Sequence, residues 1–94
     1  MNNPATQAVR VEVYSTALCP YCSRARHLLE KKGIEFTEYR VDKDPQLRTE
    51  MEQRSQRTSV PQIFISDRHI GGFDDMVELD MDGELDTLLG LEKS

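Results

Sequence analysis

The sequence predicts an α/β fold in which a four-stranded mixed β-sheet is flanked by helices, in the order βαβαββα. Apolar residues at alternate positions near the start mark a strand, and apolar residues at helical spacing follow it. A strand, a crossover helix and a second strand imply a parallel pair. A short hairpin later in the chain adds antiparallel strands, so the sheet is expected to be mixed.

The first half of the chain supplies the expected parallel pair. Valines at alternate positions from 9 to 13 are separated by polar residues, which predicts a strand. A helix is expected to open at Cys19-Pro20, because proline suits the first helical position, and Gly33 is a natural terminator. Residues 34–41 then predict the second strand, with Ile34 as one of its apolar anchors.

The next two elements are a helix and a buried strand. Asp44-Pro45 combines a capping residue with a proline, which predicts a helix that runs to about Ser55. Val60 to Ile65 is an apolar segment with β-branched residues, which predicts the third strand.

The last part of the chain is expected to form a hairpin and a final helix. Residues 66–68 turn the chain into a short fourth strand at 69–70, which Gly71-Gly72 breaks. A helical region should run from about Phe73 to about Gly90, with Gly83 interrupting it.

Length and composition predict one small intracellular domain. The 94 residues fit a single domain at 9–91, preceded by a flexible lead at 1–8 that lacks the features of a signal peptide. No apolar run approaches the ~20 residues of a membrane helix, so a cytoplasmic protein without a membrane partner is expected. The net charge is −5, and the segment from Asp74 to Ser94 holds eight acids and one base, which argues against nucleic acid. A monomer is the default expectation.

The two cysteines carry the chemistry. They form the motif Cys19-Pro20-Tyr21-Cys22, and positions three apart on a helix lie ~5 Å apart at their Cα atoms, within disulfide range. A single pair of cysteines in a reducing compartment indicates catalysis or metal binding rather than a structural disulfide. Cys19 precedes the first helical turn, where a thiolate is favoured, so Cys19 is expected to be the nucleophile and Cys22 the resolving thiol. Arg24 and Arg26, with no acid between Val13 and Leu29, favour the thiolate further.

Two other interpretations of the cysteines fit the sequence less well. Structural zinc needs four ligands, and His27 lies about 140° around the helix from Cys22, so no metal is expected. Two inert buried cysteines would not require a proline between them or a helix start beside them.

Three segments together resemble the glutaredoxin family, dithiol CPYC type, and within it the short bacterial glutaredoxin 3 class. The segments are Tyr14 to Cys22, Arg57 to Ile65 and His69 to Asp75, and the similarity extends from about Val9 to Leu89. The resemblance implies a thioredoxin-like fold and an oxidoreductase that reduces protein disulfides and glutathione mixed disulfides. It also implies glutathione as co-substrate, with no tightly bound cofactor.

The resemblance further implies a glutathione site. The Val60-Pro61 bond is expected to be cis, which would turn the backbone of Val60 outward beside Cys19. Gly72 lets the backbone approach a ligand, and Asp74 or Asp75 suits an ammonium group, although Asp74 alternatively caps the helix. The residues expected to contact glutathione are Tyr21, Arg57, Ser59, Val60, Pro61, Gly72, Phe73, Asp74 and Asp75.

The chain departs from the family pattern at two positions. Thr16 stands where members often carry lysine, and Phe73 where they often carry cysteine. The first departure bears on how the glutathione carboxylate is held, and the second removes a third thiol.

Three rival functions stay open from the sequence. One is a thioredoxin-like protein reduced directly by a flavoprotein, against which the segment from Gly72 to Asp75 argues. Another is an iron–sulfur cluster carrier, although Pro20-Tyr21 between the cysteines usually goes with redox activity in this family. A redox-sensing transcription regulator is the third, and the short acidic chain argues against it.

Overall fold

A computed structural model describes residue 7 and residues 9–91 of the chain. The predicted flexible lead therefore lies outside the described residues, apart from Gln7, whose side-chain amide exchanges two hydrogen bonds with the backbone of Glu35. The elements within residues 9–91 are β1 (Val11–Ser15), α1 (Pro20–Lys31), β2 (Thr37–Arg40), α2 (Pro45–Ser55), β3 (Gln62–Ile65), β4 (Arg68–Gly71), α3 (Phe73–Met81) and α4 (Glu84–Leu88).

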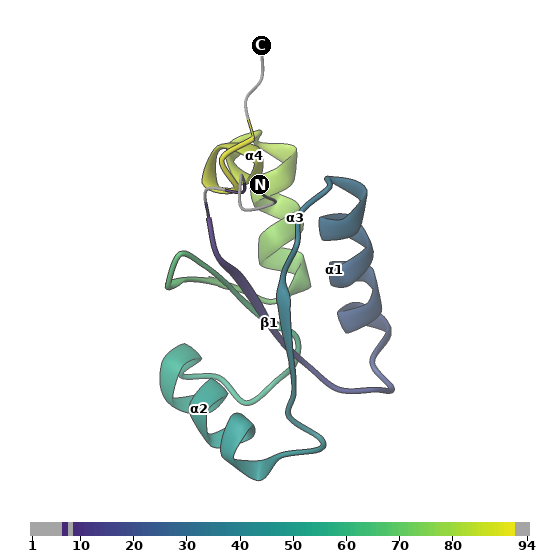
Figure 1. Ribbon diagram of the computed structural model, residues 1–94, viewed down its shortest axis with the longest axis vertical. Helices are drawn as coiled ribbons and strands as arrows, with labels where there is room; N and C mark the ends of the chain where they lie inside the picture. The colour runs from purple at the N-terminus through teal and green to yellow at the C-terminus, as the bar shows by residue number, and fades with distance from the viewer. Residues whose placement is uncertain (1–6, 8, 92–94) are drawn as a thin grey trace.

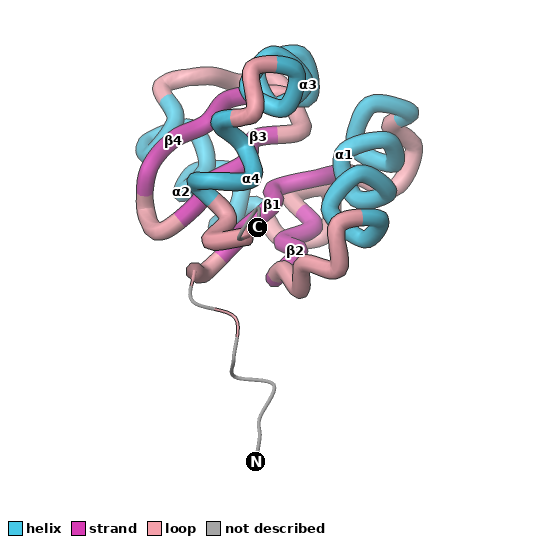
Figure 2. Tube along the Cα trace, turned by 90° about the horizontal axis from the view of Figure 1, so that it is seen from above, coloured by secondary structure: helices cyan, strands magenta, loops and turns pink. Residues whose placement is uncertain are grey.

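The strands form one mixed sheet, as predicted. Their order is β2-β1-β3-β4, and Figure 2 shows the strands succeeding one another in this order. β1 pairs with β2 in parallel and with β3 antiparallel, so that Val13 lies between Glu38 and Ile63. β3 and β4 form the antiparallel hairpin. The parallel pair places the carboxyl ends of β1 and β2 at the same edge of the sheet, next to the start of α1.

The ends of the helices follow the predicted local signals. Cys19 is the N-cap of α1 and Asp44 the N-cap of α2, and proline occupies the first turn of both helices. The carboxylate of Asp44 accepts a hydrogen bond from the backbone of Gln46 at 2.9 Å. Gly83, with φ of +80°, separates α3 from α4, which confirms the predicted interruption.

Helices cover both faces of the sheet. Helices α1 and α3 lie together on one side of β1 (Figure 1). Helix α2 lies on the opposite side, at the lower left of Figure 1. None of the described helices combines the length and apolarity that crossing a membrane requires. The main core cluster joins the sheet to α1, α3 and α4 through Val11, Val13, Ala25, Leu29, Ile34, Ile63, Ile65, Met76, Leu85 and Leu89. A smaller cluster under α2 contains Tyr14, Val41, Met51 and Phe64.

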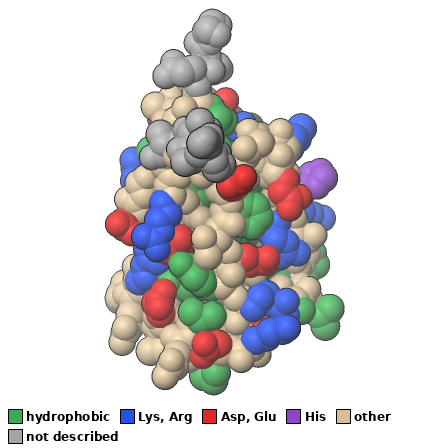
Figure 3. Space-filling model, in the orientation of Figure 1, with side chains coloured by type: hydrophobic (Ala, Val, Ile, Leu, Met, Phe, Trp, Pro, Cys, Tyr) green, Lys and Arg blue, Asp and Glu red, His purple; other side chains and the backbone are tan. Residues whose placement is uncertain are grey.

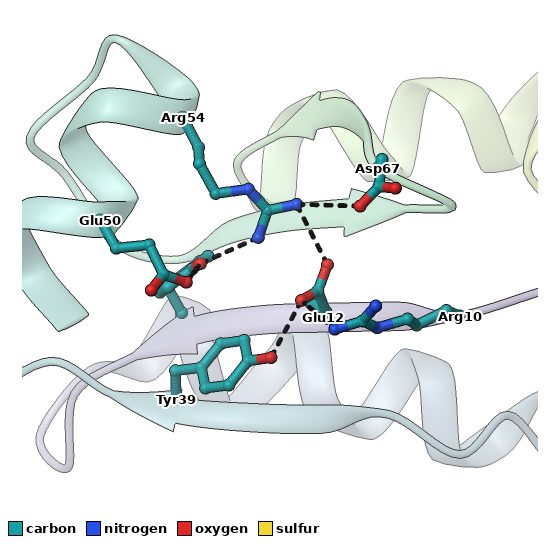
Figure 4. A network of polar contacts seen from close by, with 7 residues as sticks. Arg10, Glu12, Tyr39, Glu50, Arg54 and Asp67 are labelled. Atoms are coloured by element: carbon teal, nitrogen blue, oxygen red, sulfur yellow. Dashed lines mark hydrogen bonds and ion pairs between the residues drawn. The ribbon is translucent and has the colours of Figure 1, made fainter.

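A polar network fastens α2 to the sheet (Figure 4). Glu12 is only 3% exposed, and its carboxylate accepts hydrogen bonds from Arg54 at 3.1 Å and from the Tyr39 hydroxyl at 2.9 Å. The guanidinium of Arg54 also lies 4.0 Å from the centroid of the Phe64 ring. Burial acts to raise the pKa of Glu12, but the bonds from Arg54 and Tyr39 outweigh it and leave the pKa lowered. The buried carboxylate therefore stays ionised and paired.

Candidate active site

Cys19 and Cys22 lie on the first turn of α1 with unequal access to solvent. Both thiols are free, Cys19 is half-buried, and Cys22 is fully buried. The backbone N–H of Cys22 donates a hydrogen bond to Cys19 Sγ at 3.1 Å. The helix start thus presents the sulfur of Cys19 at the surface and places one N–H of the first turn against it, while Cys22 lies behind it.

The environment of Cys22 keeps it protonated. Burial, assisted by a hydrogen bond with Cys19, raises the pKa of Cys22 to about 12. The backbone of Thr16 and the charge of Arg26 act in the opposite direction. At neutral pH Cys22 is therefore a thiol, and it must lose a proton before it can attack another sulfur.

Asp42 helps to hold the loop before Cys19, and sequence analysis did not find it. The carboxylate of Asp42 accepts a hydrogen bond from the backbone N–H of Ala17 at 3.2 Å. Arg40 binds the same carboxylate through two hydrogen bonds and holds the pKa of Asp42 far below its usual range. The available signal was topological: Asp42 follows β2, whose carboxyl end must lie beside that of β1 in a parallel pair.

Sheet pairing gives one of the two arginines in α1 a partner that the sequence did not show. No acid lies between Val13 and Leu29, but β2 brings Glu38 to Arg26, and the two side chains form an ion pair at 2.8 Å. The guanidinium of Arg24 lies 5.3 Å from the centroid of the Tyr21 ring. The sequence argument counted only charges within the same segment, whereas the structure adds a partner for Arg26, whose charge still acts to lower the pKa of Cys22.

The nine residues expected to contact glutathione line a single cavity of about 220 Å³. The Val60-Pro61 peptide bond is cis, as the family resemblance implied. Cys19 Sγ lies 4.0 Å from the carbonyl oxygen of Val60, which places the sulfur beside this cavity. The rings of Tyr21 and Phe73, which also line the cavity, lie 6.2 Å apart between centroids.

Asp75 organises the far end of the cavity. Its carboxylate accepts a hydrogen bond from the backbone N–H of Gly72 at 2.9 Å and forms an ion pair with Arg57 at 3.0 Å. The bond from Gly72, followed by that from Arg57, lowers the pKa of Asp75. The capping role considered for Asp74 therefore belongs to Asp75, and Gly72 is the N-cap residue. Asp74 is exposed and makes no side-chain hydrogen bond with any residue that the structure describes.

Among the described residues, the side chains that could bind a metal do not gather into one group. Within residue 7 and residues 9–91, no three His, Cys, Asp or Glu side chains come together in a possible metal site. His27 lies exposed on α1. The site itself combines a half-exposed thiol, a second, protonated thiol behind it, and an adjacent polar cavity.

Comparisons with known proteins agree on one family. The family model described as Glutaredoxin matches residues 11–70. A protein named Glutaredoxin 3 from Escherichia coli K12 is 53% identical over 79 residues, covering 84% of this chain and 95% of the relative. A protein named Glutaredoxin from Pseudomonas aeruginosa is 48% identical over 79 residues, covering 84% of this chain and 94% of the relative.

Solved structures give the same result. The solution structure of glutaredoxin from Brucella melitensis has a TM-score of 0.79 and 46% identity, covering 98% of this chain and 99% of the other. A crystal structure of a buckwheat glutaredoxin–glutathione complex has a TM-score of 0.81 and 29% identity, covering 89% of this chain and 79% of the other.

Proposed function

Because this chain belongs to the glutaredoxin family and is a thiol–disulfide oxidoreductase, we propose that it uses glutathione bound in the cavity beside Cys19. In this proposal Cys19 is the nucleophile and Cys22 the resolving thiol. The observation that carries the proposal is the position of Cys19, half-exposed at the edge of a cavity lined by Val60 and the start of α3. The buckwheat glutaredoxin crystallised with glutathione supports the choice of ligand.

The reduction of a glutathione mixed disulfide needs only Cys19. The Cys19 thiolate attacks the glutathione sulfur, a Cys19–glutathione disulfide forms, and the substrate leaves as a thiolate that takes a proton from solvent. A second glutathione thiolate attacks this disulfide, releases the Cys19 thiolate and forms glutathione disulfide. The glutathione disulfide thus combines the one glutathione that is oxidised with the glutathionyl group that came from the substrate, and the substrate disulfide is reduced to a thiol.

The reduction of a protein disulfide also uses Cys22. Cys19 first forms a mixed disulfide with the substrate, and Cys22, after losing its proton, attacks Cys19 Sγ and releases the second substrate thiol. The oxidised pair is then reduced by two glutathiones. The motif geometry suits this closure, since the two sulfur-bearing residues lie on one helical turn.

Charged and polar groups that line the cavity match the charged groups of glutathione. The free carboxylate of Asp74 suits the ammonium group of the γ-glutamyl end, while backbone N–H groups at the start of α3 suit its carboxylate. Arg57 bonds Asp75 through one guanidinium nitrogen and keeps further N–H donors for the glycine carboxylate. Tyr21, Ser59 and Pro61 would form the walls around the central part of the ligand.

Replacing each thiol in turn tests the roles that the proposal gives to Cys19 and Cys22. Cys22→Ser should keep reduction of a small glutathione mixed disulfide and lose most reduction of protein disulfides, whereas Cys19→Ser should lose both. Each activity is followed in an assay coupled to glutathione reductase. Activity retained by Cys19→Ser and lost by Cys22→Ser would reverse the assignment.

The cavity has its own test. Asp74→Ala should raise the apparent KM for the small mixed disulfide about ten- to hundredfold, because a charge-assisted contact contributes ~1.5–3 kcal/mol. Asp82→Ala, which removes an exposed acid at the other end of α3, is the matched control and should change little. An unchanged KM in folded Asp74→Ala protein would place the ammonium group elsewhere.

A further inference from the structure

A second hollow starts beside the active site and runs between α1 and α3. This groove, about 440 Å³ in volume, is lined by Ser23, Arg24, His27, Leu28, Lys31, Phe73, Val77 and Asp80. Leu28 and Val77 give it an apolar floor from the two facing helices. It is larger than the cavity assigned to glutathione, and no step of the reaction described above uses it.

The groove is continuous with the reactive sulfur. Ser23 lines both the groove and a shallow hollow around Cys19, which also includes Leu18. Phe73 lines both the groove and the glutathione cavity. Leu18 is 96% exposed and presents an apolar surface next to the same hollow. A molecule that has formed a disulfide with Cys19 can therefore continue directly into the groove.

Among the described residues, the charged side chains of the groove that lack an ion-pair partner are both positive. Arg24 and Lys31 form no ion pair with any described residue, and both lie on the exposed face of α1. The acid of the groove, Asp80, pairs at 2.8 Å with Lys32, which it shares with Asp86 at 2.7 Å, so Arg24 and Lys31 together still outweigh it. Basic side chains are visible along the right-hand edge of the molecule in Figure 3, the side on which Figure 1 places α1. This excess of positive charge contrasts with the net charge of −5 for the whole chain.

We propose that the groove between α1 and α3 binds an extended segment of the protein disulfide substrate, one that carries an apolar side chain and carboxylates near its reactive cysteine. The inference rests on the proposed function, because it names the class of substrate for the same reactive sulfur. The apolar side chain contacts Leu28 and Val77, and the carboxylates pair with Arg24 and Lys31.

The geometry of α1 sets the spacing of the two carboxylates. Arg24 and Lys31 are seven residues apart, which corresponds to ~10 Å along a helix. An extended chain covers ~3.3 Å per residue and its side chains alternate between two faces, so acids four residues apart lie on one face ~13 Å apart, a spacing that the long side chains of Arg24 and Lys31 can bridge. Because Leu28 lies between Arg24 and Lys31 on α1, the matching segment has acids at the second and sixth positions after the cysteine and an apolar residue at the fourth, all on one face.

The test uses two heptapeptides joined to Cys19 in the Cys22→Ser protein. Their sequences are Cys-Ala-Asp-Ala-Leu-Ala-Glu and Cys-Ala-Lys-Ala-Leu-Ala-Lys, each activated as a thionitrobenzoate disulfide. The Cys19 thiol displaces thionitrobenzoate, so one disulfide is exchanged for another without net oxidation. The equilibrium constant for exchange of each bound peptide with glutathione is then measured, and backbone amide shifts report where each peptide lies.

The acidic peptide should be retained about four- to twenty-fivefold more strongly than the basic one, because two exposed ion pairs each contribute a factor of about two to five. The double variant Arg24→Glu, Lys31→Glu should reverse this preference. The control variant Lys43→Glu, Arg68→Glu has the same change of net charge outside the groove and should keep it. Amide shifts should be concentrated in residues 23–31 and 73–80.

Three results would overturn the inference. Equal retention of the two peptides by the protein that keeps Arg24 and Lys31 would overturn it. A preference for the acidic peptide that persists in the Arg24→Glu, Lys31→Glu variant would also overturn it. Amide shifts in residues 23–31 that change with protein concentration and without peptide would assign the groove to a second copy of the chain. Failure of the proposed function would instead appear as loss of activity on the small glutathione mixed disulfide, which this binding measurement does not involve.

Discussion

The burial of Cys22 predicts a large difference between the two thiols in their reaction with iodoacetamide. Only a thiolate reacts at an appreciable rate, and the pKa of Cys22 is raised to about 12 by burial and by its hydrogen bond with Cys19. At pH 7, five units below that value, about one Cys22 in 10⁵ is ionised. A free cysteine with a pKa of ~8.5 is about 3% ionised at the same pH. Ionisation alone therefore predicts alkylation about three thousandfold slower than that of a free cysteine.

Two single-thiol variants separate the contributions. Cys19→Ser leaves only Cys22. The ratio is smaller in this variant than the value worked for the native pair, because the hydrogen bond and the charge of Cys19 are lost, but burial, the largest cause of the raised pKa, persists. Cys22→Ser leaves only the half-exposed Cys19 and is the matched control. Mass spectrometry follows carboxamidomethylation of each variant at pH 7, with the same variants in guanidinium chloride as the unfolded reference. If folded Cys19→Ser is alkylated within about tenfold of its unfolded rate, Cys22 is not held as the structure describes.

Three further changes have defined outcomes. Gly71→Ala should lower the free energy of unfolding by about 1–3 kcal/mol, because φ is +120° and an added Cβ would overlap the carboxylate of Asp75; an unchanged urea midpoint would contradict this. Arg54→Met should cost about 2–4 kcal/mol, since it leaves the buried carboxylate of Glu12 with fewer partners, and adding Glu12→Gln should recover part of that loss in the same urea titration. Glu12→Gln alone should weaken the pH dependence of stability in acid. The folded pKa of Glu12 is lowered, so its contribution is complete above the unfolded pKa of ~4.3 and is lost as the pH falls through the folded value.

The elements of the fold could be predicted because each carries its own local signal. The caps at Cys19 and Asp44 with their prolines, and the break at Gly83, depend on residues close together in the sequence. The alternation of apolar and polar residues from 9 to 13 predicted a strand, which is present at β1, but it did not predict how buried the polar side chains of that strand are. It placed Glu12 on a polar face, yet Glu12 is buried, because α2 covers that face and supplies Arg54 as a partner. No pattern within β1 could have shown that a helix more than thirty residues later would close over it.

The contacts that the sequence could not supply are those made across the sheet. Glu38 reaches Arg26, and Asp42 reaches the backbone of Ala17, because β2 pairs in parallel with β1. The residues around the cavity were found through the family resemblance, since three separated motifs converge there. Their partners within the site, such as Arg57 with Asp75, depend on the relative position of the loop before β3 and the start of α3.

The unequal burial of the two thiols gives the proposed reaction its order. A protonated, buried Cys22 does not compete with Cys19 for an incoming disulfide, so the first bond forms at the exposed sulfur. Once Cys19 is part of a mixed disulfide, its thiol no longer contributes to raising the pKa of Cys22. The backbone of Thr16 and the charge of Arg26, which act to lower that pKa, remain in place. Cys22 thus becomes easier to ionise at the step that requires its thiolate, and glutathione, which arrives through the open cavity, competes with it for the same sulfur of Cys19.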